Sequence, residues 1–264
     1  MTPAPIHRPC PACAADRATR LAAYATAEWD VVQCDACGFV YLQNPPPYEA
    51  LQEDFAWEKT SADKKKKGGS TSLSGLNRWL RARLGMQAGK RGDGLFPRLF
   101  GAGRVLDIGC GDRIRTEAPI TPYGIEVSRA LHARADAAMR ARGGFCAHGA
   151  GAEAIWQFDP AFFDGVILHS YLEHESDPAR VLQGIHRALK PGGTVYVRVP
   201  NYGSLNRRLV GAKWCGFRHP DHVNYFTLAS LRAMAAKAGF TTDLLNRANL
   251  WVDDNIQALL HRPS

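Results

Sequence analysis

The stretch that decides the fold is Val105-Leu-Asp-Ile-Gly-Cys-Gly-Asp112. Its apolar half predicts a buried strand, and its two glycines predict a turn that lets the backbone come close to a ligand. Nineteen residues after Asp107, Glu126 lies near the end of a second apolar run, residues 123–127. An acid at the end of the next strand is placed to accept hydrogen bonds from two ribose hydroxyls. Together the two segments predict a nucleoside site.

The glycine turn does not match the motifs that bind phosphate groups. A dinucleotide fingerprint needs glycine at 114, where the chain has Ile114, and no G-x-x-x-x-G-K-[ST] loop occurs. Asp107, inside the turn, would repel a pyrophosphate but suits a cationic ligand with an amino group. The residues therefore favour S-adenosylmethionine, which carries a sulfonium and an α-ammonium and has no phosphate.

Alternating elements around this turn define the fold class. The pattern predicts strands over 104–108, 123–127, 163–168 and 194–199, helices over 127–139 and 178–189, and a turn over 191–193. Ser128 is the expected N-cap of the first helix. Strands separated by helices predict an α/β fold, a Rossmann-like open, mostly parallel sheet with helices on both faces, over residues 101–264.

The ordered motifs resemble those of the class I S-adenosylmethionine-dependent methyltransferases over about residues 101–242. They are Val105–Gly111, Gly124–Ser128, Gly151–Glu153, Phe163–Leu168, Leu172–His174, Leu189–Gly193, Val199–Asn201, Asp221–Thr227 and Ala238–Phe240. The resemblance implies a cofactor site whose residues are Asp107, Gly109, Cys110, Gly111, Glu126, Ala152, Glu153 and His169. In that site the glycine turn lines the methionine end, Glu126 holds the ribose, and Ala152 and Glu153 flank the adenine. An exposed acid at a helix start is the alternative for Glu153.

The chain departs from the family pattern directly after the turn. Arg113 stands where the family usually has a third glycine, and two prolines interrupt the following residues 113–122. The usual helix after the turn must therefore be truncated. We expect Arg113 either to close over the cofactor carboxylate or to crowd the pocket.

Methyl transfer to a hydroxyl needs a base, and histidine is the natural candidate near neutral pH. His174 follows the strand predicted over 163–168, and His219 and His222 lie in a loop rich in aromatic and ionisable groups. These three are the candidate catalytic residues. Helix capping or polar packing is the alternative role for each of them.

Two C-x₂-C pairs near the amino terminus, Cys10 with Cys13 and Cys34 with Cys37, predict a structural zinc site. Four protein thiolates leave no open coordination position for catalysis. Disulfides and free thiols are the alternatives. The pairs define a zinc-ribbon-like module over residues 1–44, similar to the amino-terminal segment of bacterial methyltransferases associated with sugars, surface polysaccharides and secondary metabolites.

A basic region over residues 45–100 connects the two parts. Twelve of the 33 Lys and Arg residues lie between positions 59 and 104, against two acidic residues, and Lys64–Lys67 form a continuous run. A helix is expected to begin near Ser72 or Ser74 and to reach Leu84. The lysine run lacks the interleaved aromatic residues that stack on bases, so nucleic acid is not the expected partner.

The sequence as a whole predicts a cytoplasmic enzyme. It has no apolar stretch long enough to span a membrane and no signal-peptide core. We expect S-adenosylmethionine-dependent methyl transfer to a small-molecule hydroxyl, on a sugar, a polysaccharide precursor or a secondary metabolite. A non-catalytic zinc protein with a degenerate cofactor site and an RNA methyltransferase are the alternatives. The oligomeric state does not follow from the sequence.

Overall fold

The computed structural model describes residues 6–46 and 94–264. The predicted helix that ends at Leu84 and the Lys64–Lys67 run lie outside these residues. The strands are β1 Ala18–Arg20, β2 Val31–Cys34, β3 Val40–Leu42, β4 Arg104–Ile108, β5 Thr121–Glu126, β6 Cys146–His148, β7 Phe163–His169, β8 Leu189–Pro200, β9 Asn224–Tyr225, β10 Thr241–Leu244 and β11 Asn255–His261. The helices are α4 Leu95–Phe100, α5 Arg129–Arg140, α6 Gly151–Ala154, α7 Pro178–Ala188, α8 Leu205–Val210 and α9 Leu228–Lys237.

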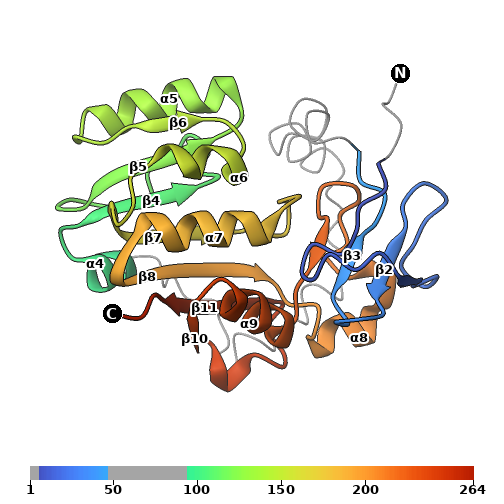
Figure 1. The fold of residues 1–264 in the computed structure, drawn as a ribbon. Helices are drawn as coiled ribbons and strands as arrows, with labels where there is room; N and C mark the ends of the chain where they lie inside the picture. The colour runs from blue at the N-terminus through green and yellow to red at the C-terminus, as the bar shows by residue number, and fades with distance from the viewer. Residues whose placement is uncertain (1–5, 47–93) are drawn as a thin grey trace, which may run out of the picture.

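Seven strands form the large sheet in the order β10-β11-β8-β7-β4-β5-β6 (Figure 1). The five strands from β8 to β6 are parallel, and β11 and β10 complete the sheet in antiparallel pairing. The predicted Rossmann-like, mostly parallel sheet is therefore confirmed. Because parallel strands end at the same edge, the residues that follow β4, β5, β7 and β8 gather there.

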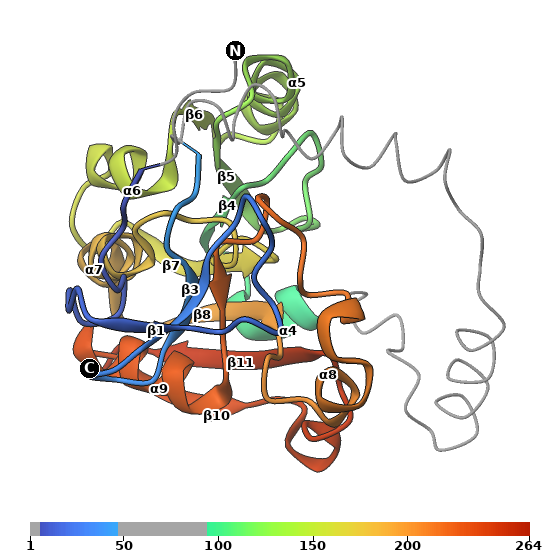
Figure 2. The ribbon, with the colours of Figure 1, turned by 90° about the vertical axis from the view of Figure 1, so that its right-hand side faces the viewer.

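Helices cover both faces of this sheet (Figure 2). On one face, α6, α7 and α9 pack apolar side chains such as Val181, Ile185 and Leu231 against the strands. On the other face, α4 places Phe96 and Phe100 against the sheet. Burial of these apolar side chains is the main source of stability for such a layered fold.

Three predicted details of the sheet and its connections are tested directly. Ser128 caps α5, accepting a hydrogen bond from the backbone N–H of Leu131, as expected. No helix forms between β4 and β5, whose connecting residues the structure describes throughout, so the truncation is complete. The predicted turn at 191–193 is wrong as a break between elements, because β8 runs through it with a register shift opposite Phe163–Gly165.

A second, small sheet lies across the carboxyl edge of the large one (Figure 1). Its order is β1-β2-β3-β9, and its antiparallel pairs include Val40 opposite Tyr225. The first three strands come from the cysteine-containing segment, but β9 comes from the carboxyl-terminal half. The module predicted over residues 1–44 therefore shares its sheet with the larger segment.

Asn224 in β9 links this small sheet to the turn that carries Glu173 and His174. Its side-chain amide donates hydrogen bonds to the backbone carbonyls of Leu172 and Glu175, both at 2.7 Å. Its amide oxygen accepts from the buried guanidinium of Arg8. The backbone N–H of Asn224 also donates to the carbonyl of Glu173 at 3.1 Å. The amide oxygen and the amide nitrogen of the Asn224 side chain thus both form hydrogen bonds, with segments far apart in the sequence.

We expect Asn224→Ala to lower the free energy of unfolding by about 2–4 kcal/mol, because it leaves buried carbonyls and the Arg8 guanidinium without their partner. Urea denaturation measures the change. Asn249→Ala, at the end of the 3₁₀ helix Arg247–Asn249 and with no side-chain hydrogen bond to the described residues, is the matched control and should shift stability by less than about 0.5 kcal/mol. Equal losses in both variants would contradict the linking role.

Candidate functional site

A cavity of about 620 Å³ opens at the carboxyl edge of the large sheet, within the size range of small-molecule sites. Its walls come from the glycine turn, the ends of β5, β7 and β8, and the loop before β9. The lining residues are Gly109, Cys110, Gly111, Asp112, Arg113, Arg115, Glu126, Val127, Ser128, Leu131, His169, Ser170, Tyr171, Glu173, His174, Arg198, Pro200, Cys215, Gly216, Arg218, Asp221, His222, Asp254 and Asn255. The cavity therefore joins the predicted cofactor turn to two of the three predicted catalytic histidines.

The glycine turn has the backbone conformation that its sequence predicts. Gly109 and Gly111 have φ angles of +70° and +64°, a left-handed region that residues with a β-carbon avoid. At Gly109 a β-carbon would also lie 2.7 Å from Cδ2 of Tyr171. Glycine at 109 thus satisfies both a backbone and a packing requirement, and it leaves the turn facing the cavity.

Glu126, at the end of β5, is held in a fixed orientation by two backbone donors. The N–H of Gly111 donates to Oε2 and the N–H of Ser128 donates to Oε1, each at 2.8 Å. The residue is 7% exposed and lines the cavity. Each carboxylate oxygen keeps a further lone pair. Glu126 therefore offers a preorganised acceptor to ligand hydroxyls.

Asp107, at the end of β4, is paired with Arg115. The guanidinium donates to Oδ2 at 2.7 Å, and it also donates to the carbonyl of Cys110 at 3.3 Å. Burial raises the pKa of Asp107 to about 6, outweighing the opposing effect of Arg115. Arg113, which we expected to close over the pocket or crowd it, lines the cavity but is exposed and has no ion-pair partner among the described residues. The arginine that contacts the turn is Arg115.

Three other predicted cofactor residues differ in their positions. His169, at the end of β7, lines the cavity; burial and the nearby Arg198 and Arg115 lower its pKa to about 4, so that it is neutral. Ala152 and Glu153 are not among the lining residues, and Glu153 pairs with Arg180 at 3.2 Å. The adenine contact assigned to Ala152 and Glu153 stays a prediction.

His174 and His222 form one wall of the cavity, with ring centroids 4.6 Å apart. Nδ1 of His174 lies 3.0 Å from Oδ1 of Asp221 and 2.8 Å from its carbonyl oxygen. Burial alone would lower the pKa of His174, but the hydrogen bond to Asp221 and the charges of Glu173 and Asp221 outweigh it and raise the pKa. Because Nδ1 carries the proton toward Asp221, Nε2 keeps its lone pair.

His222 has the opposite electrostatic environment. Its Nδ1 bonds to the carbonyl of Gly216 at 2.9 Å, and its Nε2 is buried with no hydrogen-bond partner among the described residues. Burial and the neighbouring charges of His174 and Arg218 lower its pKa well below the usual value. His219, the third predicted histidine, does not line the cavity, and its Nδ1 contacts the Tyr225 hydroxyl at 3.1 Å.

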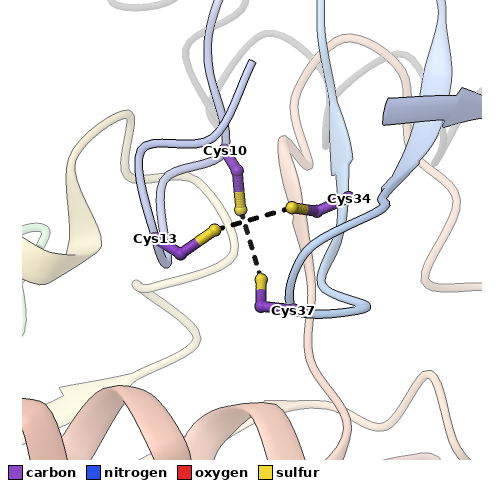
Figure 3. A group of neighbouring side chains, drawn as sticks. All are labelled: Cys10, Cys13, Cys34 and Cys37. Atoms are coloured by element: carbon purple, nitrogen blue, oxygen red, sulfur yellow. Dashed lines mark hydrogen bonds between the residues drawn. The ribbon is translucent and has the colours of Figure 1, made fainter. Parts of the chain in front are cut away.

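Two groups of side chains have the spacing of metal ligands. In Glu173, His174 and His222, one ligand atom from each residue lies within 4.8 Å of the other two. The second group is the predicted set Cys10, Cys13, Cys34 and Cys37, whose sulfurs also lie within 4.8 Å of one another. Figure 3 shows the four sulfurs pointing toward a common centre, with the pairs Cys10–Cys37 and Cys13–Cys34 each 3.5 Å apart. All four thiols are free, so the disulfide alternative is not adopted.

Sequence reasoning missed several charged residues in the cavity. Arg115 follows the turn in an irregular segment, where no periodicity marks an inward side chain. Asp221 lies beside His222 in the sequence, yet its bond is to His174, 47 positions away. Arg198 lines the cavity from β8 and donates to the Ser170 hydroxyl at 3.0 Å. Of these three residues, only Asp221 lies in a segment that resembles a family motif, Asp221–Thr227, and that resemblance could have marked it as a site residue.

The doubly wound sheet, with a glycine turn and strand-end carboxylates at its carboxyl edge, is the arrangement of a Rossmann-like nucleoside-binding fold. A sequence-family profile described as a methyltransferase domain matches residues 77–245. The chain belongs to this family. Among solved structures, a SAM-dependent methyltransferase from Archaeoglobus fulgidus superposes with a TM-score of 0.54 at 16% identity, covering 77% of this chain and 99% of that one.

Two curated relatives are named ubiquinone biosynthesis O-methyltransferase. The protein from Methylococcus capsulatus is 39% identical over 114 residues, which is 41% of this chain and 46% of the relative. The protein from Paraburkholderia phymatum is 30% identical over 155 residues, 53% of this chain and 65% of the relative. The matches thus span less than two thirds of these relatives. Within residues 6–46 and 94–264, no helix combines the length and hydropathy that a membrane crossing requires.

We expect His174 to titrate above the ordinary histidine value of 6.5, and His222 to remain neutral where His174 titrates. Asp221→Asn should lower the pKa of His174, because it removes the charge that stabilises the imidazolium. Side-chain NMR titration of the histidines measures both values. His186, on α7 and distant from Asp221 in the fold, is the internal control; an unmoved His174 resonance in the variant would refute the assignment.

Proposed function

We propose that this chain transfers a methyl group from S-adenosylmethionine to a hydroxyl of a small-molecule acceptor. The observation that carries the proposal is a single cavity lined both by Glu126 and by the His174–His222 wall. A cofactor site and an acceptor site in one space satisfy the basic need of direct group transfer, which is alignment of donor and acceptor.

The residues at the nucleoside end fit the cofactor. The turn approaches the cavity without side chains at Gly109 and Gly111, and the Glu126 carboxylate is oriented by two backbone N–H groups. Asp107, which directly precedes the turn, is buried behind the residues that line the cavity, and its Oδ1 has no hydrogen-bond partner among the described residues. In this proposal Glu126 binds the ribose hydroxyls, and Val127, Ser128 and Leu131 form the neighbouring wall.

Bound S-adenosylmethionine supplies a methyl group activated by its sulfonium for in-line displacement. The chain's own residues position the acceptor hydroxyl and take its proton. When the acceptor oxygen receives the methyl group, Nε2 of His174 would take the hydroxyl proton. Asp221 holds the His174 ring and stabilises the resulting imidazolium, as the acid does in other Asp–His pairs. His222, neutral and with Nε2 unpartnered, is positioned to accept a second hydrogen bond from the acceptor.

The acceptor class follows from this wall and from the relatives. The curated relatives are named as O-methyltransferases, which supports oxygen as the atom methylated. The cavity also contains Arg198, Arg218 and Asp221, polar groups suited to an acceptor rich in oxygen. We infer a hydroxylated small molecule, with a sugar, a polysaccharide precursor or a secondary metabolite as the favoured type.

We also propose that Cys10, Cys13, Cys34 and Cys37 bind a structural zinc ion. Tetrahedral zinc with bonds of about 2.3 Å places its sulfurs about 3.8 Å apart, which the sulfur positions approach. The metal would supply folding free energy to a segment too small for a core of its own. Thiolate ligands need a reducing compartment, which is why we place the protein in the cytoplasm.

Titration calorimetry tests the cofactor assignment. We expect wild-type protein to bind S-adenosylmethionine and S-adenosylhomocysteine, and Glu126→Gln to weaken both by about 10- to 100-fold, the range for a lost charge-assisted hydrogen bond. Affinity for S-adenosylmethionine should also fall as pH drops below about 6, because protonation of Asp107 removes a negative charge next to the glycine turn and so weakens attraction of a cationic ligand. Asp107→Asn should remove this pH dependence.

Glu117→Gln, in the exposed segment after the turn, is the matched control and should bind both ligands like the wild type. Absence of both binding heat and a thermal shift with either ligand would remove the proposed enzymatic function and leave a non-catalytic domain.

Metal analysis tests the zinc assignment. We expect one zinc ion per chain, and we expect Cys34→Ser or chelation to lower the melting temperature by on the order of 10 °C. Arg8 of the cysteine segment bonds to Asn224, which in turn bonds to the turn that carries His174. Metal loss should therefore reduce methyl transfer more than it reduces S-adenosylhomocysteine binding. Cys215→Ser, outside the cluster, should keep its full zinc content. Metal-free protein with unchanged stability would contradict the site.

A further inference from the structure

Glu173, His174 and His222 form a cluster that brings one carboxylate and two imidazoles together in the cavity. All three residues line the cavity, and one ligand atom from each lies within 4.8 Å of the other two. Glu173 and His174 come from the turn after β7, and His222 comes from the loop before β9. The fold thus assembles, from two separate segments, a ligand set that zinc uses in proteins, two histidines and a glutamate.

Two of these side chains are buried with a ligand atom that has no partner. Oε2 of Glu173 and Nε2 of His222 have no hydrogen-bond partner among the residues that the structure describes, and the two residues are only 1% and 4% exposed. Such atoms are rare in native proteins, because burial removes their hydration without compensation. Two of them in one cluster beside a cavity indicate a group that the described part of the chain does not supply.

The other ring nitrogen of each histidine is held as it is at metal sites. Nδ1 of His174 lies 3.0 Å from Oδ1 of Asp221, and Nδ1 of His222 lies 2.9 Å from the carbonyl oxygen of Gly216. An acceptor at Nδ1 places the proton there and leaves the lone pair on Nε2. Metal-bound histidines almost always make such a contact, which fixes the tautomer and the orientation of the ring. Both rings therefore present a ligand nitrogen.

We propose that Glu173, His174 and His222 bind a zinc ion, in addition to the ion proposed for the four cysteines. Two imidazoles and a carboxylate favour zinc over magnesium, which prefers oxygen ligands and keeps several waters. Zinc bonds of about 2.0–2.2 Å place tetrahedral ligand atoms about 3.4 Å apart, so each pair of these atoms needs to approach by at most about 1.4 Å. Three protein ligands leave a fourth position for water or a ligand oxygen.

The ion uses the nitrogen that the proposed function assigns to the acceptor hydroxyl. Zinc on Nε2 of His174 occupies the lone pair that takes the proton, so zinc binding and proton transfer exclude each other. This consequence rests on the proposed function, whereas the metal site itself does not. Because the site has three protein ligands and the cysteine site has four thiolates, we expect dialysis to remove the ion from the cavity and to leave the cysteine-bound ion in place.

Zinc titration of the dialysed full-length protein, in competition with a chromophoric chelator, counts the sites. We expect the wild type to retain one ion and to take up a second. Glu173→Gln keeps the shape of the side chain and should weaken the second ion by at least about 10-fold, since loss of even an outer contact of a metal ligand costs that much. His222→Gln should have the same effect. Co²⁺ added to the zinc-retaining protein should show visible absorption bands without the thiolate charge-transfer band of a cysteine site.

His219→Gln is the matched control, because His219 lies in the same loop as His222 but does not line the cavity. It should take up the second ion like the wild type. If Glu173→Gln does not fold, as judged by circular dichroism, the His222→Gln titration decides. A wild type that takes up no second ion, or unchanged uptake in His222→Gln, would overturn the site, and displacement of the ion by equimolar magnesium chloride would overturn its assignment to zinc.

Titration of the same samples with S-adenosylhomocysteine separates this proposal from the proposed function. Absence of zinc uptake together with intact S-adenosylhomocysteine binding removes the metal site alone. Zinc uptake without S-adenosylhomocysteine binding removes the proposed function and leaves the metal site.

Discussion

The hydrogen bonds of Asn224 are the constraint on which the His174–His222 wall of the cavity depends. One side chain joins the small sheet, through Arg8, to the turn that follows β7, through the carbonyls of Leu172 and Glu175. The backbone of the same segment continues the small sheet as β9. Since Glu173 and His174 lie between those two carbonyls, the position of the His174 ring depends on a segment more than 120 residues earlier in the chain. The cysteine-containing segment can thus hold His174 in position although it does not itself line the cavity.

The two carboxylates at the carboxyl edge of the large sheet are stabilised in different ways, and the difference matters for ligand binding. Glu126 receives two backbone N–H bonds, which fix its orientation without using all of its lone pairs. Asp107 has one side-chain partner and one empty oxygen, so burial raises its pKa despite Arg115. Backbone donors cannot move away, whereas a guanidinium on a flexible stem can. Glu126 is therefore held rigidly at the cavity, whereas Asp107 is held by a side chain that can move.

Local sequence patterns predicted the parts of this molecule that local physics controls. The strand over 104–108, the N-cap at Ser128 and the loss of the helix after the turn follow from apolar runs, a capping residue and two prolines. The cysteine pairs were also identifiable, because two cysteines three positions apart are brought close together by a single tight turn. The pairing of β3 with β9 was not predictable in this way. It joins two short strands about 180 positions apart, and a two-residue strand has no period to detect.

The same reasoning explains why the sequence named His174, His219 and His222 as equals and the structure does not. All three are histidines that follow predicted strands or lie in polar loops, but only His174 and His222 line the cavity. The Asp221 carboxylate bonds to His174 and raises the pKa of that ring. Burial and the charge of His174 lower the pKa of His222. Two imidazoles with centroids 4.6 Å apart cannot both be protonated without strong repulsion. At most one of the two rings therefore carries a positive charge at a time, and that charge is more stable on His174, where Asp221 lies beside it.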